Sequence, residues 1–527
     1  MTEDNKGNSD AVLYLEKGKR GLLKIVFGRT TIVLLLLCVQ AFVLFLGFRF
    51  LGQYIAYGFG GYTLLSLIIV IILINKPQNP SVQNSWIILI LLIPVFGALL
   101  YIFVDTQWGS RLVNRRLQSL IELTRSYMTQ DTGVIKRLRA QDPGTANLVN
   151  YMVEKADSPV YENTSVKYFP LGEDKFEEMI RQLEQAKEFI FMEYFIVEEG
   201  YMWGRILKIL EKKVKEGVEV RFMYDGMCSL VLLPYKYPEK LEALGIRCKM
   251  FSPIRPALST RQNNRDHRKI LVIDGHTAFT GGINLADEYI NRKVRFGHWK
   301  DTAVMIKGDA VKSFTLMFLQ VWNINERSED YERYMNRVIP IPKQSSGFVM
   351  PYCDSPLDDE NVGEQVYLDI INRAERYVHI MTPYLILDYD LINALSFAAK
   401  RGVEVVIIMP HIPDKKYAFA LAKTYYPELI RAGVQIWEYT PGFIHAKQFV
   451  CDDNRAVVGT INLDFRSLYL HFECAAYMYQ VDAVKDIESD FQDTLAKSQK
   501  ITMEDCKKVK IHTKLFGRLL RLFAPLM

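Results

Sequence analysis

The chain has 527 residues, which is long enough for two or three domains that each bury a hydrophobic core. Hydrophobic residues make up 49% and charged residues 24%, and the small net charge of +5 argues against a dedicated nucleic-acid-binding protein, which would have a strongly basic domain. The seven cysteines are odd in number and form no C-x-x-C pair, so a disulfide framework and a zinc site are both disfavoured.

Apolar sequence dominates the N-terminal region. A polar, basic leader (residues 1–30) precedes a region (31–104) with three charge-free runs, at residues 30–48, 50–75 and 77–104. About 20 apolar residues cross a bilayer as a helix; the first and third runs meet this requirement, whereas glycines weaken the second. A signal peptide would explain one run but not three. We therefore expect two to three transmembrane helices and a multi-pass protein of the cell membrane.

Basic residues on both sides of the apolar runs bear on their orientation. Five lysines and arginines between residues 17 and 29 precede the first run, so the leader is expected on the cytoplasmic side. Three arginines between residues 111 and 116 follow the third run and favour the same side for that end. Two spans satisfy both clusters, whereas three spans would place the rest of the chain outside, and the sequence leaves both topologies open.

Beyond a polar, mostly helical connector (residues 105–160), one pattern occurs twice. The β-rich run "EFIFMEYFIVEEG" is followed by the amphipathic "MWGRILKILEKKVKEG" and the strand-like "VEVRFMYDG"; "RYVHIMTPYLILD" is followed by "YDLINALSFAAKRG" and "VEVVIIMP". Strand, helix and strand within about 35 residues form a βαβ unit with parallel strands. The sequence therefore predicts two α/β lobes, at residues 161–340 and 345–500, with the joint "PIPKQSSG" between them.

The C-terminal segment (residues 501–527) has the pattern of a basic amphipathic helix. Its leucines and phenylalanines fall close to one helical face, and its lysines and arginines form the polar side. Such a helix suits an anionic lipid surface, but a tail helix docked on the domain has the same pattern. Both interpretations remain open at the level of sequence.

A sparse motif of titratable residues follows each βαβ unit. Both copies have a histidine, a lysine two positions later, an aspartate seven positions after the histidine and an asparagine seventeen positions after it: His267, Lys269, Asp274 and Asn284, then His445, Lys447, Asp452 and Asn462. If each motif lies in a strand, its histidine and lysine share a face, and glycine before each asparagine allows a ligand to approach the backbone. Together these groups form a receptor for phosphate.

Two histidines can divide the work of phosphodiester cleavage. A neutral imidazole attacks phosphorus and forms a phosphohistidine, while a protonated one donates to the leaving alkoxide and then deprotonates the next nucleophile. Because imidazole titrates near pH ~6.5, both protonation states coexist near neutrality. The lysines and asparagines would bind the non-bridging oxygens. The sequence has no acidic cluster of metal-binding spacing, so we expect no metal and no other cofactor.

The carboxylates near the motifs are predicted to have different roles. Asp274 and Asp452 lie at an odd offset from their histidines, and capping a turn explains them at least as well as catalysis. Asp301, in "GHWKDTAV", and Glu473, in "HFECAAY", are better candidates for orienting the imidazoles. A single H-x-K would be interpreted as structural, but two copies with equal offsets behind matching βαβ units argue against coincidence.

The motif segments "HRKILVIDGHTAFTGGIN" and "HAKQFVCDDNRAVVGTIN" resemble the paired H-x-K-x4-D motifs of the phospholipase D superfamily, and the resemblance covers about residues 160–500. Within the superfamily, the whole chain resembles the bacterial cardiolipin synthases. This narrower resemblance rests on "SWIILILLIPVFGALLYIF", "HWKDTAVMIKGDAV", "NLDFRSLYLHFE" and "LFGRLLRLFAPLM". One departure is that members usually have two hydrophobic N-terminal segments, whereas this chain has three, which leaves the topology open.

The resemblance implies two phospholipase D-like α/β/α lobes related by a pseudo-twofold axis, with the active site between them. It implies transfer of a phosphatidyl group between two phosphatidylglycerol molecules, releasing glycerol. His267 and His445 would be nucleophile and general acid/base, with His267 favoured as nucleophile, and Lys269, Lys447, Asn284 and Asn462 would bind phosphate. The expected partners are phosphatidylglycerol and membrane phospholipids, without nucleic acid.

The motifs alone leave other activities open. Attack by water on the same intermediate would give phosphatidic acid, so a membrane-anchored hydrolase is the main alternative. A nuclease is disfavoured by the low net charge and the apolar N-terminus, since proteins that bind nucleic acids concentrate lysine and arginine. A non-catalytic scaffold is disfavoured because both histidines and both lysines are present. The acceptor lipid is not determined by the sequence.

Overall fold

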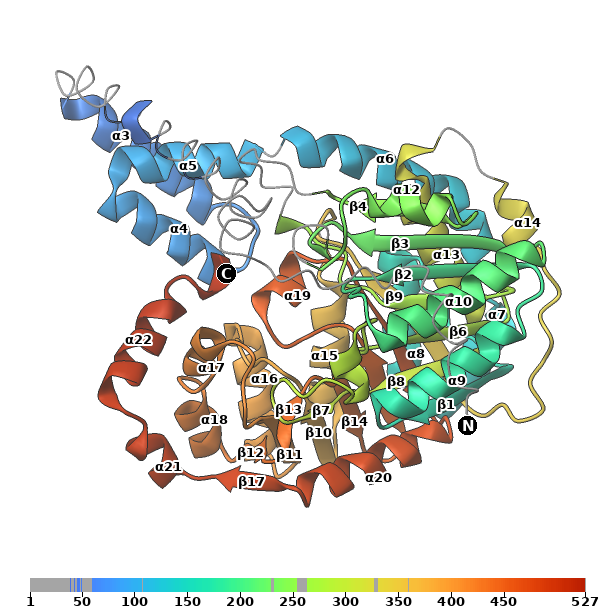
Figure 1. Cartoon of the computed structure of the whole chain (residues 1–527). Helices are drawn as coiled ribbons and strands as arrows, with labels where there is room; N and C mark the ends of the chain where they lie inside the picture. Colours follow the sequence, from blue (N-terminus) through green and yellow to red (C-terminus); the bar gives the residue numbers. More distant parts are fainter. Residues whose placement is uncertain are drawn as a thin grey trace, which may run out of the picture.

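Two β-sheets form the centre of the molecule in a computed structural model (Figure 1). The structure describes residues 59–106, 108–228, 232–253, 263–326, 330–358 and 360–526, together with residues 38, 42, 45–47 and 49. The predicted leader (1–30) and nearly all of the first apolar run lie outside the described residues.

The first sheet has the strand order β1-β8-β6-β5-β2-β3-β4. Its strands are β1 (Thr164–Phe169), β2 (Phe189–Tyr194), β3 (Glu219–Asp225), β4 (Arg247–Phe251), β5 (Ile270–Ile273), β6 (Thr277–Gly281) and β8 (Ala303–Gly308). Strands β2, β3 and β4 are parallel, and β5 joins β2 in antiparallel orientation.

The second sheet has the order β17-β12-β11-β10-β14-β15-β16-β9. Its strands are β9 (Phe348–Asp354), β10 (Tyr377–Met381), β11 (Glu404–Pro410), β12 (Gln435–Tyr439), β14 (Gln448–Cys451), β15 (Arg455–Gly459), β16 (Glu473–Tyr479) and β17 (Ser498–Ile501). Strands β10, β11 and β12 are parallel and β14 is antiparallel to β10. Read from β9, this sheet repeats the order of the first strand for strand, with β17 added at the edge, so the predicted duplication is confirmed.

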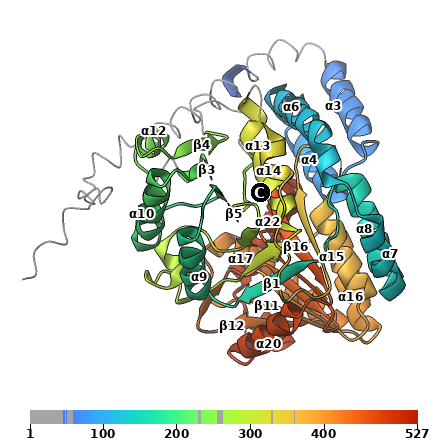
Figure 2. The ribbon, with the colours of Figure 1, turned by 90° about the vertical axis from the view of Figure 1, so that its right-hand side faces the viewer.

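Helices cover both faces of each sheet, as an α/β/α lobe requires (Figure 2). In the first lobe, the helices are α9 (Gly172–Glu184), α10 (Tyr201–Lys215), α12 (Tyr237–Glu242), α13 (Val311–Trp322) and α14 (Tyr331–Met335). In the second lobe, they are α15 (Val362–Arg373), α16 (Tyr389–Lys400), α17 (Lys416–Ala422), α18 (Tyr426–Ala432), α19 (Phe465–Tyr469) and α20 (Ala483–Leu495). The predicted β2-α10-β3 and β10-α16-β11 units are both present with parallel strands.

One hydrophobic cluster joins the lobes. It contains Phe191 and Val272 of the first sheet, Val406 and Val458 of the second, and residues of α13 and α20. The strands read as nearly continuous apolar runs because both of their faces are covered. Since the inner faces pack on a shared core, the two lobes form one body with a fixed relative orientation.

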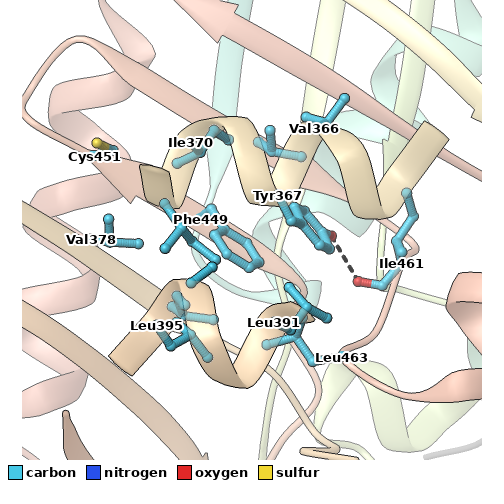
Figure 3. Packing of buried hydrophobic residues seen from close by; sticks show 14 of the residues in the cluster. Val366, Tyr367, Ile370, Val378, Leu391, Leu395, Phe449, Cys451, Ile461 and Leu463 are labelled. Carbon is cyan, nitrogen blue, oxygen red and sulfur yellow. Dashed lines mark hydrogen bonds between the residues drawn. The ribbon is translucent and has the colours of Figure 1, made fainter. Parts of the chain in front are cut away.

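The outer face of the second sheet packs on α15 and α16 (Figure 3). The Tyr367 and Phe449 rings stack with their centroids 4.0 Å apart, and Leu391 and Leu395 of α16 complete the cluster. The Tyr367 hydroxyl donates to the Ile461 carbonyl at 2.9 Å. This bond fixes the backbone immediately before Asn462, so the core positions one of the predicted site residues.

The connector is helical and packs against both lobes. It comprises α6 (Trp108–Thr124), the 3-10 helix η2 (Arg125–Met128), α7 (Thr132–Gln141) and α8 (Pro143–Ala156). Helix α6 contacts α13, whereas α8 contacts β9 and α15.

The N-terminal helices α3 (Phe59–Ile74), α4 (Pro80–Leu92) and α5 (Pro94–Thr106) share a small core that includes Leu73, Ile90 and Ala98. The third apolar run is interrupted before Pro94, because proline lacks the N–H of a continuous helix and disfavours helical backbone in the residue before it. Within the described part of the chain, no helix combines the length and apolarity needed to span a membrane. The expected transmembrane helices therefore stay a prediction.

Candidate active site

A cavity of about 590 Å³ lies between the lobes and contains both motif histidines. His267 and Asn284 line it from the first lobe, and His445 and Asn462 line it from the second. The remaining lining residues are Phe195, Ile196, Met227, Arg265, Glu288, Tyr289, Arg295, Phe296, Trp299, Tyr384, Ile386, Asp414, Lys415, Tyr417, Ala418, Asp464, Phe465, Arg466, His471 and Ala524. Charged and polar side chains make up half of the lining and aromatic or aliphatic side chains the other half, so the cavity suits a ligand with both polar and apolar parts.

The backbone of each histidine is held by the opposite lobe. Strands β7 (His298–Lys300) and β13 (Gly442–Ile444) pair in parallel, and the His445 N–H donates to the Lys300 carbonyl at 2.6 Å. The His267 N–H donates to the Phe472 carbonyl at 2.9 Å. We expected the H-x-K segments to lie in strands, but β5 and β14 begin only at Ile270 and Gln448. That expectation was wrong because the backbone at each histidine bonds to the opposite lobe before the strand of its own sheet begins.

Each imidazole also contacts a carboxylate of the opposite lobe. His267 Nδ1 lies 2.9 Å from both Glu473 oxygens, and His445 Nδ1 lies 2.6 Å from Asp301 Oδ2. Glu473 is the first residue of β16, and Asp301 lies between β7 and β8. Each candidate orienting carboxylate thus contacts the histidine of the other lobe. Because these contacts engage Nδ1, each histidine keeps its Nε2 for a ligand in the cavity.

The two carboxylates have different surroundings. The Thr460 hydroxyl donates to Glu473, whereas the Thr302 N–H donates to Asp301 at 2.8 Å. The position equivalent to Thr460 is Gly282, where a Cβ would lie 2.0 Å from an Asp301 oxygen. The "GG" of the first motif therefore makes room for Asp301, and the "GT" of the second supplies a hydroxyl to Glu473.

These surroundings separate the protonation behaviour of the two pairs. Burial would raise the pKa of Glu473, but His267 and its hydrogen bonds hold this pKa well below its usual range. Burial raises the pKa of Asp301 to about 6, against the effect of Lys447. Burial lowers the pKa of His267 to about 3, and burial together with the lysines lowers the pKa of His445. Burial thus disfavours the imidazolium at both positions, and the two carboxylates differ because the pKa of Asp301 is raised whereas that of Glu473 is lowered.

The two motif lysines are buried behind the histidines. Each ammonium donates to the carbonyl of its own motif's histidine, and Lys447 Nζ also lies 2.9 Å from His445 Nδ1. Burial lowers the pKa of Lys269 to about 8 and that of Lys447 to about 7. Neither lysine is among the residues that line the cavity. Their predicted contact with phosphate stays a prediction, and their positive charge acts beside the imidazoles.

The two asparagines line the cavity with part of their hydrogen-bonding capacity engaged. Asn284 accepts from the Ile196 N–H at 2.9 Å and donates to the Tyr289 hydroxyl at 2.8 Å. Asn462 donates to the Ser467 hydroxyl at 3.0 Å. An amide nitrogen has two hydrogens, so each asparagine keeps one donor for a ligand oxygen.

Asp274 and Asp452 lie outside this cavity. Asp274 accepts three backbone N–H groups, from Lys187, Glu188 and Phe189 at 2.8–2.9 Å, at the start of β2. Asp452 accepts from the corresponding three residues of the second lobe, residues 375–377, at 2.8–3.0 Å. Both aspartates thus tie the end of the motif strand to the start of the neighbouring strand.

His471 and Trp299 are site residues that the sequence reasoning missed. They occupy equivalent positions, two residues before Glu473 and Asp301, and their ring centroids lie 5.6 Å from His267 and 5.5 Å from His445, respectively. Both nitrogens of His471 and the Trp299 indole nitrogen are buried without a hydrogen-bond partner among the described residues. The alternation of extended backbone, in which residues two apart share a face, is the signal that would have found them.

A metal site has one candidate among the described residues. His267, His471 and Glu473 place their ligand atoms within 4.8 Å of one another. The Glu473 carboxylate already binds His267 Nδ1 and the Thr460 hydroxyl, so a metal would have to break the imidazole–carboxylate pair. The expectation of a metal-independent reaction stays a prediction.

The chain is similar to known proteins over most of its length. The family model "Cardiolipin synthase, PLD-like domain" matches residues 179–322 and 367–495, just over half of the chain, and "Phospholipase_D-nuclease N-terminal" matches residues 64–104. "Cardiolipin synthase 2" of Bacillus anthracis is 31% identical, covering 88% of this chain and 91% of that protein. "Cardiolipin synthase" of Geobacillus kaustophilus (strain HTA426) is 32% identical, with 88% and 92% covered.

A protein of Streptococcus mutans serotype c described as "Uncharacterized protein" is 53% identical, covering 87% of this chain and 99% of its own. Among solved structures, the phosphatidylserine synthase of Haemophilus influenzae Rd KW20 matches with a TM-score of 0.54 and 16% identity, over 73% of this chain and 97% of that one. At this identity the match supports the fold alone. The family model and the relatives show more: the chain belongs to the cardiolipin synthase family of the phospholipase D superfamily and is an enzyme of the phosphatidyltransferase class.

Proposed function

We propose that the chain is a cardiolipin synthase that transfers a phosphatidyl group from one phosphatidylglycerol to another, giving cardiolipin and glycerol. The observation that carries the proposal is the crossed pair of imidazole–carboxylate contacts beside one cavity. Two histidines that line one cavity from two lobes suit a single phosphodiester. The named relatives support the choice of lipid substrate.

In the first step, His267 acts as the nucleophile. Its Nδ1 hydrogen is held by ionised Glu473, which leaves the lone pair of Nε2 for attack on phosphorus. A P–N bond forms, and the P–O bond to the glycerol headgroup breaks. His445, as an imidazolium beside Asp301, donates its proton to the departing oxygen, so that glycerol leaves as a neutral alcohol.

In the second step, His445 acts as the general base. It takes the proton from a headgroup hydroxyl of a second phosphatidylglycerol, and that oxygen attacks phosphorus as the P–N bond breaks. A bound phosphodiester anion would raise the pKa of both imidazoles, which opposes the effect of burial and favours an imidazolium at His445 in the complex. The Asn284 and Asn462 amides donate to the non-bridging oxygens, and Lys269 and Lys447 stabilise the developing charge.

We further propose that residues 31–104 anchor the enzyme in the cell membrane through two to three transmembrane helices. The support is the sequence of the three charge-free runs and the match of residues 64–104 to the N-terminal family model. An anchor would hold the cavity at a surface rich in lipid alcohols, which favours transfer to a lipid over transfer to water. Accessibility of single cysteines to an impermeant reagent in intact cells tests the number of spans.

The proposal is tested by incubating the detergent-purified full chain with phosphatidylglycerol alone in the presence of EDTA. Mass spectrometry of the lipids and an assay of free glycerol follow the reaction. Equal amounts of cardiolipin and glycerol are expected, with both products lost in the His267→Ala and His445→Ala proteins. Phosphatidic acid as the sole lipid product would show that the enzyme is a hydrolase and not a synthase. Loss of activity in EDTA would contradict a metal-independent reaction.

A further inference from the structure

The C-terminal helix α22 (Ile511–Arg521) docks on the second lobe through one narrow side. Gly517 lies so close to α17 that a Cβ there would be 2.5 Å from the Ala420 carbonyl oxygen. Leu520 packs on the core of the second lobe, and Ala524 beyond the helix is buried. Residues 517, 520 and 524 share a face because they are three and four positions apart. The helix is therefore held firmly in place.

The opposite side of α22 is apolar and exposed. Ile511, Leu515 and Leu519 recur every four positions and are 84%, 70% and 54% exposed, and Leu522 follows at 41%. Leucine on the surface is common as an isolated residue, but a stripe over three turns of one helix marks an interaction surface. The docked glycine and the exposed leucines lie on opposite sides of the same helix, so this stripe does not contribute to the core.

Basic residues run along one flank of the exposed stripe. Lys510, Lys514, Arg518 and Arg521 are spaced by four, four and three positions, and residues 506–527 contain no aspartate or glutamate. Lys514 is anchored to the Lys507 carbonyl at 2.8 Å, and Arg521 lies 3.5 Å from Glu428. An apolar stripe with a basic flank is complementary to an anionic lipid surface, which offers acyl chains and negative headgroups side by side.

Helix α22 runs along the edge of the molecule beside α17, and its C-terminal end approaches α4 (Figure 1). The Ser85 hydroxyl of α4 donates to the Leu522 carbonyl at 2.8 Å. The 3-10 helix η6 (Ala524–Leu526) contacts α4 and α19, and Ala524 lines the cavity. The C-terminal end of α22 thus contacts α4, and the following η6 extends to the wall of the cavity.

We propose that α22 lies flat in the headgroup layer of an anionic bilayer and positions the cavity at the membrane surface. The apolar stripe inserts between the acyl chains, and the basic flank binds anionic phosphates. This binding of α22 to the membrane does not depend on the proposed reaction. Only the further consequence, that lipid substrates enter the cavity beside η6, rests on the proposed function. A second copy of this chain is the other occupant that the stripe could accept, and the experiment separates the two.

The depth of α22 is measured with a polarity-sensitive thiol probe on the full chain reconstituted in phosphatidylglycerol–phosphatidylcholine vesicles. Cys38 is exposed, so the background carries Cys38→Ser, and the probe is attached at Leu515→Cys. Val338→Cys, at a residue that is 99% exposed and follows α14 in the first lobe, is the matched control. A blue shift and quenching by brominated lipids are expected at position 515 but not at 338.

Two results would overturn the proposed binding of α22 to the membrane. One is a water-like emission at position 515 without quenching by the brominated lipids. The other is a blue shift that brominated lipids do not quench and that grows with protein concentration, which would indicate a second copy of the chain on α22.

An activity measurement keeps this inference separate from the proposed function. Lys514→Glu with Arg518→Glu is compared with Lys208→Glu and Lys212→Glu, a matched double charge reversal on α10. On anionic vesicles at low salt, the α22 protein is expected to form product at least about 25-fold more slowly, because each of the two basic side chains near the surface contributes roughly a factor of five in binding. Both proteins should match the unmodified enzyme on detergent-dispersed lipid. Equal rates for the α22 and α10 double variants on vesicles would overturn the proposed binding of α22 to the membrane. Inactivity of the unmodified enzyme both on vesicles and on detergent-dispersed lipid would contradict the proposed function.

Discussion

The contact between each imidazole and a carboxylate of the other lobe is the feature that the chemistry depends on most. The carboxylate fixes the ring tautomer and stabilises the imidazolium that forms during transfer. We predict that Asp301→Asn and Glu473→Gln each lower kcat by about 10²–10⁴-fold, the range of a general acid–base contribution. Steady-state assays on phosphatidylglycerol measure this, and circular dichroism verifies the fold. Wild-type kcat in either folded protein would exclude the carboxylates from the reaction.

The aspartate that completes each motif is predicted to act on stability. Asp274→Asn places an N–H group opposite one of the three backbone N–H groups that Asp274 accepts, so a buried donor loses its partner. The expected loss is about 1–3 kcal/mol of unfolding free energy. A lower thermal midpoint with kcat within a few-fold of wild type would agree with this placement. A loss of kcat as large as that of Asp301→Asn, at unchanged stability, would contradict it.

The pH dependence of kcat/KM should reflect Asp301 and Lys447. Burial raises the pKa of Asp301 to about 6, so the activating carboxylate forms as the pH rises through this value. Burial lowers the pKa of Lys447 to about 7, so its positive charge is lost as the pH rises further. We predict a narrow optimum of kcat/KM between these two pH values. Because the buried groups interact, the apparent pKa values of the acidic and basic limbs of the profile belong to the whole cluster. Asp301→Asn should lose the acidic limb while Asp274→Asn keeps it; a flat profile from pH 5 to 9 would contradict this account.

At the scale of elements, the start of α8 attaches the connector to the second lobe. Asp142 caps the helix through the Gly144 N–H at 2.9 Å, and its side chain binds Arg373 at 2.6 Å and Arg455 at 2.9 Å. Burial would raise the pKa of Asp142, but these partners hold it below the usual range. The stabilisation is therefore complete above the unfolded pKa, near ~3.9, and is lost as the pH falls through the folded value.

This attachment predicts a difference between two helix caps. Asp131 caps α7 in the same way, through the Gly133 N–H at 2.6 Å. Asp131→Ala should cost about 1 kcal/mol, the usual value of a cap. Asp142→Ala should cost about 2–4 kcal/mol, because two arginines also lose their partner. Thermal denaturation at pH 7 compares the two proteins, and equal costs would show that the arginine contacts add nothing.

The elements that were predictable are those with a local signal. Both βαβ units followed from the change of hydrophobic period within about 35 residues. The interruption of the third apolar run at Pro94 also has a local cause. It was not predicted because the run was judged by its apolar content and not by its proline. The strand boundaries near the motifs were not predictable, because β5 and β14 begin late where the backbone pairs with the other lobe.

At the scale of the whole molecule, the duplicated sheets explain why the motif occurs twice. The motif histidines, lysines and asparagines could be named from their spacing, and Asp301 and Glu473 from the segments that follow the two motifs. Their crossed pairing could not, since Glu473 is 206 residues from His267 and Asp301 is 144 residues from His445. The shared core between the sheets and the backbone bonds between the lobes set the lobes' relative position. His471 and Trp299 became recognisable when this pairing was known.

The central claim is that both half-sites act on one phosphodiester, with His267 carrying the phosphatidyl group. The most direct measurement is an alkaline quench of the enzyme during turnover of phosphatidylglycerol labelled with 32P, followed by peptide mass mapping. The account predicts a labelled phosphatidyl adduct on His267 that is absent from the His267→Ala protein and disappears when excess acceptor lipid is chased in. Cardiolipin formation without an adduct, or an adduct on any other residue, would contradict it.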